Sequence, residues 1–335
     1  MEKSKMTVKE LAALAGVSPA TVSLVLNNKK GVSEEKRQEI LKLIEETGYT
    51  SSRKEEIRNR NILFIKYSKA DSIVEENVGF ISRIMDAAEA ECQKQKYHLV
   101  VMANDGRLQE ALNRIKTEDF CGILILGTEL DASDHEALKG ISIPYVVVDN
   151  SMPHFDCNCV AIDNKENVFK AIESFAKQGF TELGYLKGTE KIQNFTEREQ
   201  GVLEAAAHFS MKLPEENIFP VPSTMLGAFE MTQKYLVAGR TFPGCLFADN
   251  DIIAIGAMKA LKMAGFRIPE DISVIGFDNI PFSKIYSPTI STMNVDTGLL
   301  GRISLSLLRN MEENKEYKNV KVTVGGDLIR RQSTR

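Results

Sequence analysis

The stretch "TVKELAALAGVSPATVSLVLNN", residues 7–28, has the pattern of two short helices joined by a tight turn. Thr7 and Glu10 have the spacing of a capping box, in which each side chain satisfies a free amide of the first turn. Gly16 can take the left-handed conformation that ends a helix, and Ser18 is then an N-cap followed by a proline at the first helical position. The pattern predicts a helix-turn-helix.

A third helix is expected to begin at Ser33, where two glutamates occupy the first turn, and to end at Gly48. Placed at 100° per residue, the inward face of the second helix is apolar and is expected to pack on the third. The residues expected in this small core are Val22, Val25, Leu26, Ile40, Leu41 and Ile44.

The outward face of the second helix carries Ala20, Ser23, Leu24 and Asn27. Polar side chains there can donate to phosphate oxygens, and apolar ones can contact thymine methyl groups in a major groove. The free amides at the N-terminal end of the helix also favour phosphate. The spacing therefore favours a DNA-reading helix, and the alternative is that Leu24 packs on a neighbouring domain.

Charge is unevenly distributed along the chain. The 335 residues have a net charge of -4, but residues 1–60 carry +3 and residues 61–335 carry -7. A basic N-terminal segment on an acidic body indicates one part that can approach phosphate and a larger part that need not. The apolar content of 43% and charged content of 26% are typical of soluble globular proteins, and the length suits two or three domains.

The cytoplasm is the expected location. No apolar run reaches the roughly 18 residues of a membrane span, and the N-terminus lacks the apolar region of a signal peptide. The five cysteines are odd in number and scattered, which fits a reducing compartment. No contact with a membrane is expected.

After a polar linker at residues 50–60, short apolar runs alternate with amphipathic segments. The expected strands are residues 61–67, 97–102, 121–127, 143–149, 159–163, 182–188, 245–249 and 271–278. The expected helices are 75–95, 106–117, 164–178, 197–209, 223–238 and 250–264. Apolar strands separated by helices indicate parallel sheets covered on both faces. These units exceed one doubly wound domain, so we expect two α/β lobes, with a break near Asp163 and a return crossing around Ser291.

The segment "TVKELAALAGVSPATVSLVLNNKKGVSEEKRQEILKLIEETGY" closely resembles the DNA-binding headpiece of the lactose-repressor (LacI–GalR) family of bacterial transcription regulators. The resemblance extends to "AIDNKENVFKAIESFAKQGFTELGYLKG", "FADNDIIAIGAMKALKMAGFRIPEDISVIGFDNIPFSKIYSPTISTM" and "GGDLIRRQST". It implies a headpiece at 1–49, a hinge at 50–60 and an effector domain at 61–335 that is similar to periplasmic sugar-binding proteins. The implied lobes are 61–162 with 293–321, and 163–292 with 322–335, joined by three crossovers.

The resemblance also implies roles for residues of the headpiece. Pro19, Ala20 and Leu24 occupy the base-contacting positions of the family. The other expected DNA-binding residues are Thr7, Ser18, Thr21, Ser23, Asn27, Lys29 and Ile57. Many members carry arginine where this chain has Leu24, so a bidentate guanine contact is not available there and a different operator preference is expected.

The hinge departs from the family pattern. Its members carry "NxxAxxL", which inserts a leucine into the minor groove, whereas this chain has "SSRKEEIRNR". Glu55 holds the alanine position, and Ile57 lies one residue from the leucine position. A minor groove repels adjacent glutamates. Either the register slips, or Ile57 is the inserted side chain, or this contact is absent.

A sugar-type ligand needs carboxylates and amides that converge on hydroxyl groups, often with an arginine or an aromatic face. Such side chains are expected where parallel strands end. By resemblance, Arg198, Asn250 and Asp278 are the foremost candidates for ligand contact. The further candidates are Ser68, Asp71, Phe80, Asp149, Asp163 and Phe195. Asp163 precedes a helix and Asp149 precedes Asn150, so N-capping and a turn are the respective alternatives.

No nucleotide-binding, zinc-protease or nucleophile-elbow motif occurs, so we expect neither an enzyme nor a bound cofactor or metal. We expect a transcription regulator, a repressor, that binds a pseudopalindromic operator as a homodimer. The chain has no heptad tail after the last matching strand, which favours a dimer over a tetramer. The expected effector is a sugar or sugar derivative. The alternatives are a nucleobase or nucleoside, a protein corepressor, or a stand-alone solute receptor.

Overall fold

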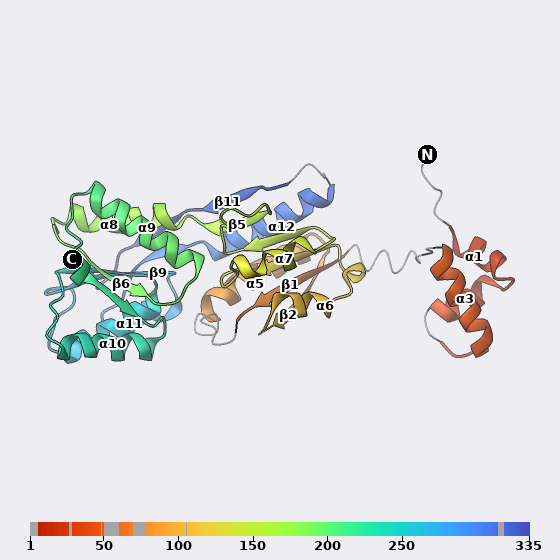
Figure 1. Cartoon of the computed structure of the whole chain (residues 1–335), viewed down its shortest axis with the longest axis horizontal. Coiled ribbons are helices and arrows are strands. Elements are labelled where there is room, and N and C mark those ends of the chain that lie inside the picture. Colours follow the sequence, from red (N-terminus) through yellow and green to blue (C-terminus); the bar gives the residue numbers. More distant parts are fainter. Residues whose placement is uncertain are drawn as a thin grey trace. The chain divides into compact units, whose positions relative to one another are not determined.

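The computed structural model describes residues 6–26, 29–47, 49, 60–69, 78–104, 106–313 and 318–335. The chain divides into two compact units (Figure 1). One contains the described residues up to Asn61 together with Glu118–Cys121, and the other contains Ile62–Thr117 and Gly122–Arg335. Three residues expected in binding sites, Asn27, Ile57 and Asp71, lie outside the described residues.

The N-terminal unit contains the expected helices α1 (Val8–Leu14), α2 (Pro19–Leu26) and α3 (Glu34–Thr47). The capping box is present: Glu10 N donates to Thr7 Oγ1 (3.3 Å), and Thr7 N donates to Glu10 Oε2 (2.6 Å). Gly16 ends α1 with φ +61°, a conformation that favours glycine. The bend of 102° between α1 and α2 is that of a helix-turn-helix.

The core of this unit differs from the expectation at one position. Val22, Val25 and Ile40 are buried as predicted, but Leu41 is 42% exposed. Leu43 packs on the core in its place. Positions 40, 43 and 44 follow the i, i+3, i+4 spacing of one helix face, which position 41 does not share.

The second unit contains two lobes, each built on a six-stranded sheet (Figure 1). The first sheet has the order β11-β5-β4-β3-β1-β2, and the pairings recorded between β11, β5, β4, β3 and β1 are parallel. Its strands are β1 (Asn61–Tyr67), β2 (His98–Asn104), β3 (Gly122–Leu126), β4 (Tyr145–Val148), β5 (Cys159–Ile162) and β11 (Lys321–Val324). Its helices are α5 (Val78–Lys94), α6 (Leu108–Asn113), α7 (His135–Lys139) and α12 (Thr297–Glu313), with the 3-10 turns η1 (Thr117–Asp119) and η2 (Ala132–Asp134).

The second sheet has the order β12-β10-β9-β8-β6-β7 and is parallel except for the antiparallel edge strand β12. Its strands are β6 (Gly184–Gly188), β7 (Ile218–Val221), β8 (Cys245–Ala248), β9 (Ser273–Phe277), β10 (Ser291–Val295) and β12 (Gly326–Ile329). Its helices are α8 (Asn164–Lys177), α9 (Gln193–His208), α10 (Met225–Val237) and α11 (Asp251–Met263), with η3 (Glu215–Asn217) and η4 (Pro281–Lys284). Helices cover both faces, so β3 and β9 are buried along their whole length.

The chain crosses between the lobes three times. The crossings follow β5, β10 and β11, because β10 lies wholly in the second sheet and β11 wholly in the first. The second and third crossings therefore fall a few residues after the lobe boundaries expected at 292–293 and 321–322. No single described helix is long and apolar enough to cross a membrane; only the bent pair of α1 and α2 meets the length and composition criteria together.

Candidate functional site

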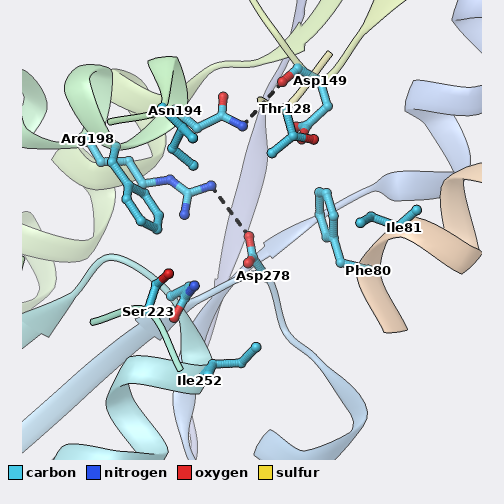
Figure 2. Close-up of a pocket in the computed structure, with 12 residues that line it drawn as sticks. Phe80, Ile81, Thr128, Asp149, Asn194, Arg198, Ser223, Ile252 and Asp278 are labelled. Atoms are coloured by element: carbon cyan, nitrogen blue, oxygen red, sulfur yellow. Dashed lines mark hydrogen bonds and ion pairs between the residues drawn. The ribbon is translucent and has the colours of Figure 1, made fainter. Parts of the chain in front are cut away.

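A pocket lies between the two lobes, where strands of both sheets end (Figure 2). Its lining residues are Phe80, Ile81, Thr128, Asp149, Ile192, Asn194, Phe195, Arg198, Ser223, Asn250, Ile252 and Asp278. The first lobe supplies Phe80, Ile81, Thr128 and Asp149, and the second lobe supplies the rest. Six of the nine ligand residues expected from the sequence line it.

Arg198, on α9, is fixed in the wall of this pocket and is only 3% exposed. Its Nε donates to Asn164 Oδ1 (2.9 Å), its Nη1 donates to the carbonyl of Asp249, and its Nη2 donates to Asp278 Oδ1 (3.4 Å). The guanidinium lies 3.7 Å from the ring centroid of Phe277. Three of its five N–H groups are therefore engaged within the protein, and the remaining two belong to Nη1 and Nη2.

The two pocket aspartates share an unusual backbone. Asp149 follows β4 with φ +68°, and Asp278 follows β9 with φ +95°. Residues other than glycine uncommonly adopt this left-handed region, although aspartate does so more readily than most. Each strand end therefore places a carboxylate at the pocket at a cost in backbone strain.

The carboxylate of Asp149 is incompletely bonded. Thr128 Oγ1 donates to its Oδ2 (2.6 Å), but its buried Oδ1 has no hydrogen-bond partner among the residues described. Burial raises the pKa of Asp149 to about 7. The hydrogen bond from Thr128 and the charge of Arg198 lower this pKa, but by less than burial raises it. The turn role expected as an alternative belongs to Asn150, whose Nδ2 donates to the carbonyl of Gly127 (2.8 Å). The Oδ1 atom of Asp149 is thus available to a ligand.

Polar groups of the second lobe lie at the same pocket. Ser223 is 2% exposed, and its Oγ has no partner in the described part of the chain. Its backbone N donates to Glu190 Oε1 (2.9 Å), which fixes the position of the residue. Asn250 caps α11 through its Oδ1, which accepts from Ile253 N (2.8 Å). The cap leaves the Nδ2 group of Asn250 as the donor at the pocket.

Two aromatic rings flank these polar groups. Phe80 of α5 lies on the side of Asp278 opposite Arg198, as Figure 2 shows, and it is 3% exposed. Phe195 lies on α9, one turn before Arg198. A Cβ atom at position 188 would lie 2.3 Å from the Phe195 ring, so Gly188 permits this ring position. The pocket therefore combines apolar faces with carboxylate, hydroxyl and amide groups, as ligand sites commonly do.

The N-terminal unit presents a second candidate surface along α2. Pro19, Ala20 and Ser23 are exposed, while Leu24 is only partly exposed. A Cβ on Gly31 would be in ordinary contact with Leu24 Cδ1, at 3.6 Å, so this leucine lies against the loop that follows α2. The expected DNA-contacting residues Thr7 and Ser18 use their side chains in helix caps; Ser18 Oγ accepts from Thr21 N (3.1 Å) and lies 2.9 Å from Thr21 Oγ1. Lys29 is exposed.

Comparison with known proteins places this geometry in a family. Residues 7–52 match the model of "Bacterial regulatory proteins, lacI family", and residues 172–334 match that of the "Periplasmic binding protein-like domain". The HTH-type transcriptional regulator GalR of Lacticaseibacillus casei is 29% identical over 337 residues, which cover 98% of this chain and 99% of that protein. The chain therefore combines a lacI-family helix-turn-helix domain with a periplasmic-binding-protein-like domain.

A second relative and a solved structure are similar to this chain along its whole length. The HTH-type transcriptional repressor PurR of Mannheimia succiniciproducens is 27% identical over 340 residues, covering 98% of each chain. The structure of the lac repressor dimer bound to operator and the anti-inducer ONPF matches with a TM-score of 0.73, at 22% identity and 99% coverage of each chain. With its lacI-family DNA-binding domain and relatives that are transcription regulators, the protein is a DNA-binding transcription regulator rather than an enzyme.

Two expected ligand residues that the structure describes, Ser68 and Asp163, do not line the pocket. Ser68 Oγ donates to the carbonyl of Asn104 (3.2 Å), and Asp71 lies outside the described residues. Asp163 is the N-cap of α8, because its Oδ1 accepts from Glu166 N (3.3 Å), and it borders a separate recess. For Asp163 the structure therefore shows the N-cap, which was the alternative to ligand contact.

The sequence reasoning missed several lining residues. The polar ones are Thr128, Asn194 and Ser223, and the apolar ones are Ile81, Ile192 and Ile252. Thr128 and Ser223 follow β3 and β7, so the same strand-end argument that selected Asp149 and Asp278 applies to them. Asn194 precedes Arg198 by about one turn and lies on the same face of α9. This spacing can be recognised in the sequence once a helix is expected there.

Proposed function

We propose that this regulator binds a neutral, hydroxyl-bearing molecule of the sugar class between its lobes, and that this ligand changes its affinity for operator DNA. The observation that carries the proposal is a pair of unpartnered buried oxygens, Asp149 Oδ1 in the first lobe and Ser223 Oγ in the second. Both line the same pocket.

Unpaired buried polar atoms favour a ligand that can pair with them. Each such atom costs about 1–3 kcal/mol if it stays unpaired. A carboxylate oxygen needs a donor, and a hydroxyl can donate or accept. Sugar hydroxyl groups provide both functions at short spacing, so one molecule can satisfy Asp149 and Ser223 together. Because these residues belong to different lobes, such a ligand favours the closed arrangement.

The charges of the lining favour a neutral ligand over an anionic one. The ionisable groups of the lining are Asp149, Arg198 and Asp278, and Arg198 is already paired with Asp278. An anionic group such as a phosphate would therefore meet two carboxylates and a guanidinium that is largely engaged. Like charges at close range in a buried site are strongly unfavourable. We infer that the pocket prefers an unphosphorylated sugar.

A nucleobase is the second candidate, and the aromatic lining favours it. Phe80 and Phe195 offer two rings at the pocket, and a planar base can stack on such faces. A base also carries donors and acceptors that can pair with Asp149 and Asn250. The two ligand classes are distinguished by direct binding experiments.

We further propose that residues 1–49 form the operator-binding headpiece, residues 50–60 the hinge, and residues 61–335 the effector domain. In this proposal Pro19, Ala20 and Leu24 contact bases. Thr21, Ser23 and Asn27 contact the DNA backbone, and Lys29 lies near it. Ile57 is the proposed minor-groove contact of the hinge. A shift of the lobes changes operator affinity through this hinge by altering the spacing of two headpieces. The site of action is the cytoplasm, where the operator lies.

The assembly that we propose is a homodimer. A single helix-turn-helix reads few bases, and two copies match the two-fold symmetry of a palindromic operator. The edge strand β2 exposes apolar side chains, with Val100 at 40% and Val101 at 48% exposure. Exposed apolar edge strands favour pairing with another chain. Sedimentation equilibrium tests the proposal, which predicts the mass of two chains.

A thermal-shift panel tests the ligand class. We would compare a pentose, a hexose, a β-linked disaccharide, a hexose 6-phosphate and a purine base at equal concentrations. The proposal predicts that a neutral sugar raises the melting temperature and that the phosphorylated hexose does not. A shift with the purine base alone would contradict the sugar class and support the second candidate.

A further inference from the structure

One arginine connects the lobes at the side of the pocket formed by α5. Arg83, on α5 of the first lobe, donates from Nη2 to the carbonyl of Asp278 (3.2 Å) and from Nη1 to the carbonyl of Asn279 (3.3 Å). Both acceptors belong to the segment that follows β9 in the second lobe. The guanidinium thus forms a fork across the boundary between the lobes.

The backbone segment that accepts these two hydrogen bonds has an uncommon conformation. Asp278 and Asn279 have φ values of +95° and +49°, which are uncommon for residues other than glycine. The side chain of Asn279 is engaged within its own lobe, since its Nδ2 donates to Asn294 Oδ1 (2.7 Å) and its Oδ1 accepts from Arg331 Nη2 (2.6 Å). The two carbonyl groups are therefore left to Arg83.

The side chain of Arg83 points toward the second lobe. Its Nε is buried and has no hydrogen-bond partner within the described ranges. Both Nη atoms donate to carbonyl groups of the other lobe. The first turn of α5 also approaches this lobe, because a Cβ on Gly79 would lie 3.5 Å from Pro281 Cδ. Burying part of a guanidinium is unfavourable unless hydrogen bonds compensate, and here the carbonyl groups of the second lobe do so.

We propose that Arg83 is a positioning residue that couples the ligand carboxylate of Asp278 to closure of the lobes. Asp278 is held from two sides: its side chain accepts from Arg198 of its own lobe, and its carbonyl accepts from Arg83 of the other lobe. Opening of the lobes breaks the Arg83 fork and leaves this backbone held by its own lobe alone, through Asp278 N to the carbonyl of Met293 (3.0 Å) and Asn279 N to Thr292 Oγ1 (3.2 Å). Ligand contact at Asp278 and lobe closure thereby become one event; this coupling rests on the proposed ligand site.

The fork is distinct from the hydrogen bonds that join α9 to the first lobe. Asn194 Nδ2 donates to the carbonyl of Asp149 (3.2 Å), and Ser151 Oγ donates to Glu197. Those contacts connect α9 with the segment after β4, and they do not touch the segment that contains Asp278. Removing Arg83 therefore releases the Asp278 segment selectively.

Amide hydrogen exchange on the ligand-free full chain tests the proposal. The variants are Arg83→Met, which keeps the aliphatic stem, Arg83→Lys, which keeps the charge without the fork, and Arg114→Met as a control at an exposed arginine of the same lobe. Peptides that cover residues 278–283 should exchange about tenfold faster in Arg83→Met and less so in Arg83→Lys. The control should match the wild type. Unchanged exchange at 278–283 in Arg83→Met, or an equal increase along the whole chain, would overturn the proposal.

A distance measurement provides the second readout. Spin labels at Glu136→Cys in the first lobe and Glu204→Cys in the second, both exposed positions, report the separation of the lobes in a Cys121→Ser background. Arg83→Met should broaden the distance distribution toward longer values. An unchanged distribution contradicts the role in closure. Both experiments use the protein without ligand, so their outcome is independent of which molecule the pocket binds.

Discussion

Arg198 Nη2 lies 3.4 Å from Asp278 Oδ1, and the two side chains are only 3% and 4% exposed. This buried pair joins α9 to the end of β9 within the second lobe, and both residues also line the pocket. The same contact therefore contributes to the stability of the lobe and to the arrangement of the ligand site.

Replacement of Arg198 by methionine should destabilise the protein more than replacement of Asp278 by asparagine. The methionine leaves Asp278 buried without its cation and removes the bonds to Asn164 and Asp249, and loss of one partner of a buried pair costs about 3–5 kcal/mol. The asparagine retains an acceptor for Nη2. Urea unfolding measures both, and Lys165→Met, from an exposed pair with Glu204, is the control that should change the midpoint little. Equal loss in all three variants would contradict the prediction.

Asp149 should make stability depend on pH. Burial raises its pKa to about 7, so the folded state binds a proton more tightly than the unfolded state does. The free energy of unfolding should then fall as the pH rises from about 4 to 7 and should level off above that range. Asp149→Asn should make the slope of the unfolding free energy against pH shallower by up to about 1.4 kcal/mol per pH unit, which is the contribution of one bound proton. Asp249 and Asp251, whose pKa values burial raises to about 7 and about 8, retain part of the dependence, and Asp251 extends it slightly above pH 7. An identical slope in wild type and variant would rule out this role.

Ser223→Ala should weaken ligand binding without loss of stability. Its Oγ is buried without a partner in the described structure, so removal should leave the free energy of unfolding unchanged or raise it by up to about 1 kcal/mol. Ser273→Ala is the matched control, because its Oγ is also buried and unpartnered but lies at the start of β9, outside the pocket. Isothermal titration with the sugar that gives the largest thermal shift should show weaker binding only for Ser223→Ala. Equal affinity in both variants would exclude Ser223 from the site.

Leu24→Arg should change operator preference more than stability. Leu24 is only partly buried and lies beside Gly31, so an arginine can extend outward with modest loss of packing. A guanidinium there can pair with guanine in the major groove, at about 1–3 kcal/mol of discrimination. Selection of binding sites from a randomised operator pool should show guanine enrichment for the variant only. A preference that matches the wild type would contradict a base-contacting role for this position.

Helices and strands could be predicted from the sequence where a cap or an apolar run marks them. Caps at Thr7, Gly16 and Ser18 define α1 and α2, and the apolar run at 61–67 coincides with β1. Leu41 was misplaced because a helical face is only about 100° wide and neighbouring positions differ by that angle. The strands β7, β10, β11 and β12 were not among the expected strands. They are four or five residues long, and β11 and β12 lie at sheet edges where the apolar signal is weak.

The pocket could be predicted only in part. Aspartates and an arginine at strand ends are conspicuous, so Asp149, Arg198 and Asp278 were identified. Ser223 and Thr128 also follow strands, but serine and threonine do so in ordinary turns, so their position alone does not single them out. The Arg83 fork depends on the meeting of residues 195 positions apart along the chain. No local pattern encodes such a contact.

The central claim is that a neutral sugar in the pocket controls operator binding, and fluorescence anisotropy of a labelled operator tests it most directly. The full chain is titrated against the operator alone and with each member of the sugar and purine panel. We predict that a neutral sugar changes the operator Kd by about tenfold or more, in either direction, and that Asp149→Asn and Ser223→Ala reduce the change. An operator Kd that no neutral sugar alters, or a response to sugar that both variants retain in full, would contradict the account.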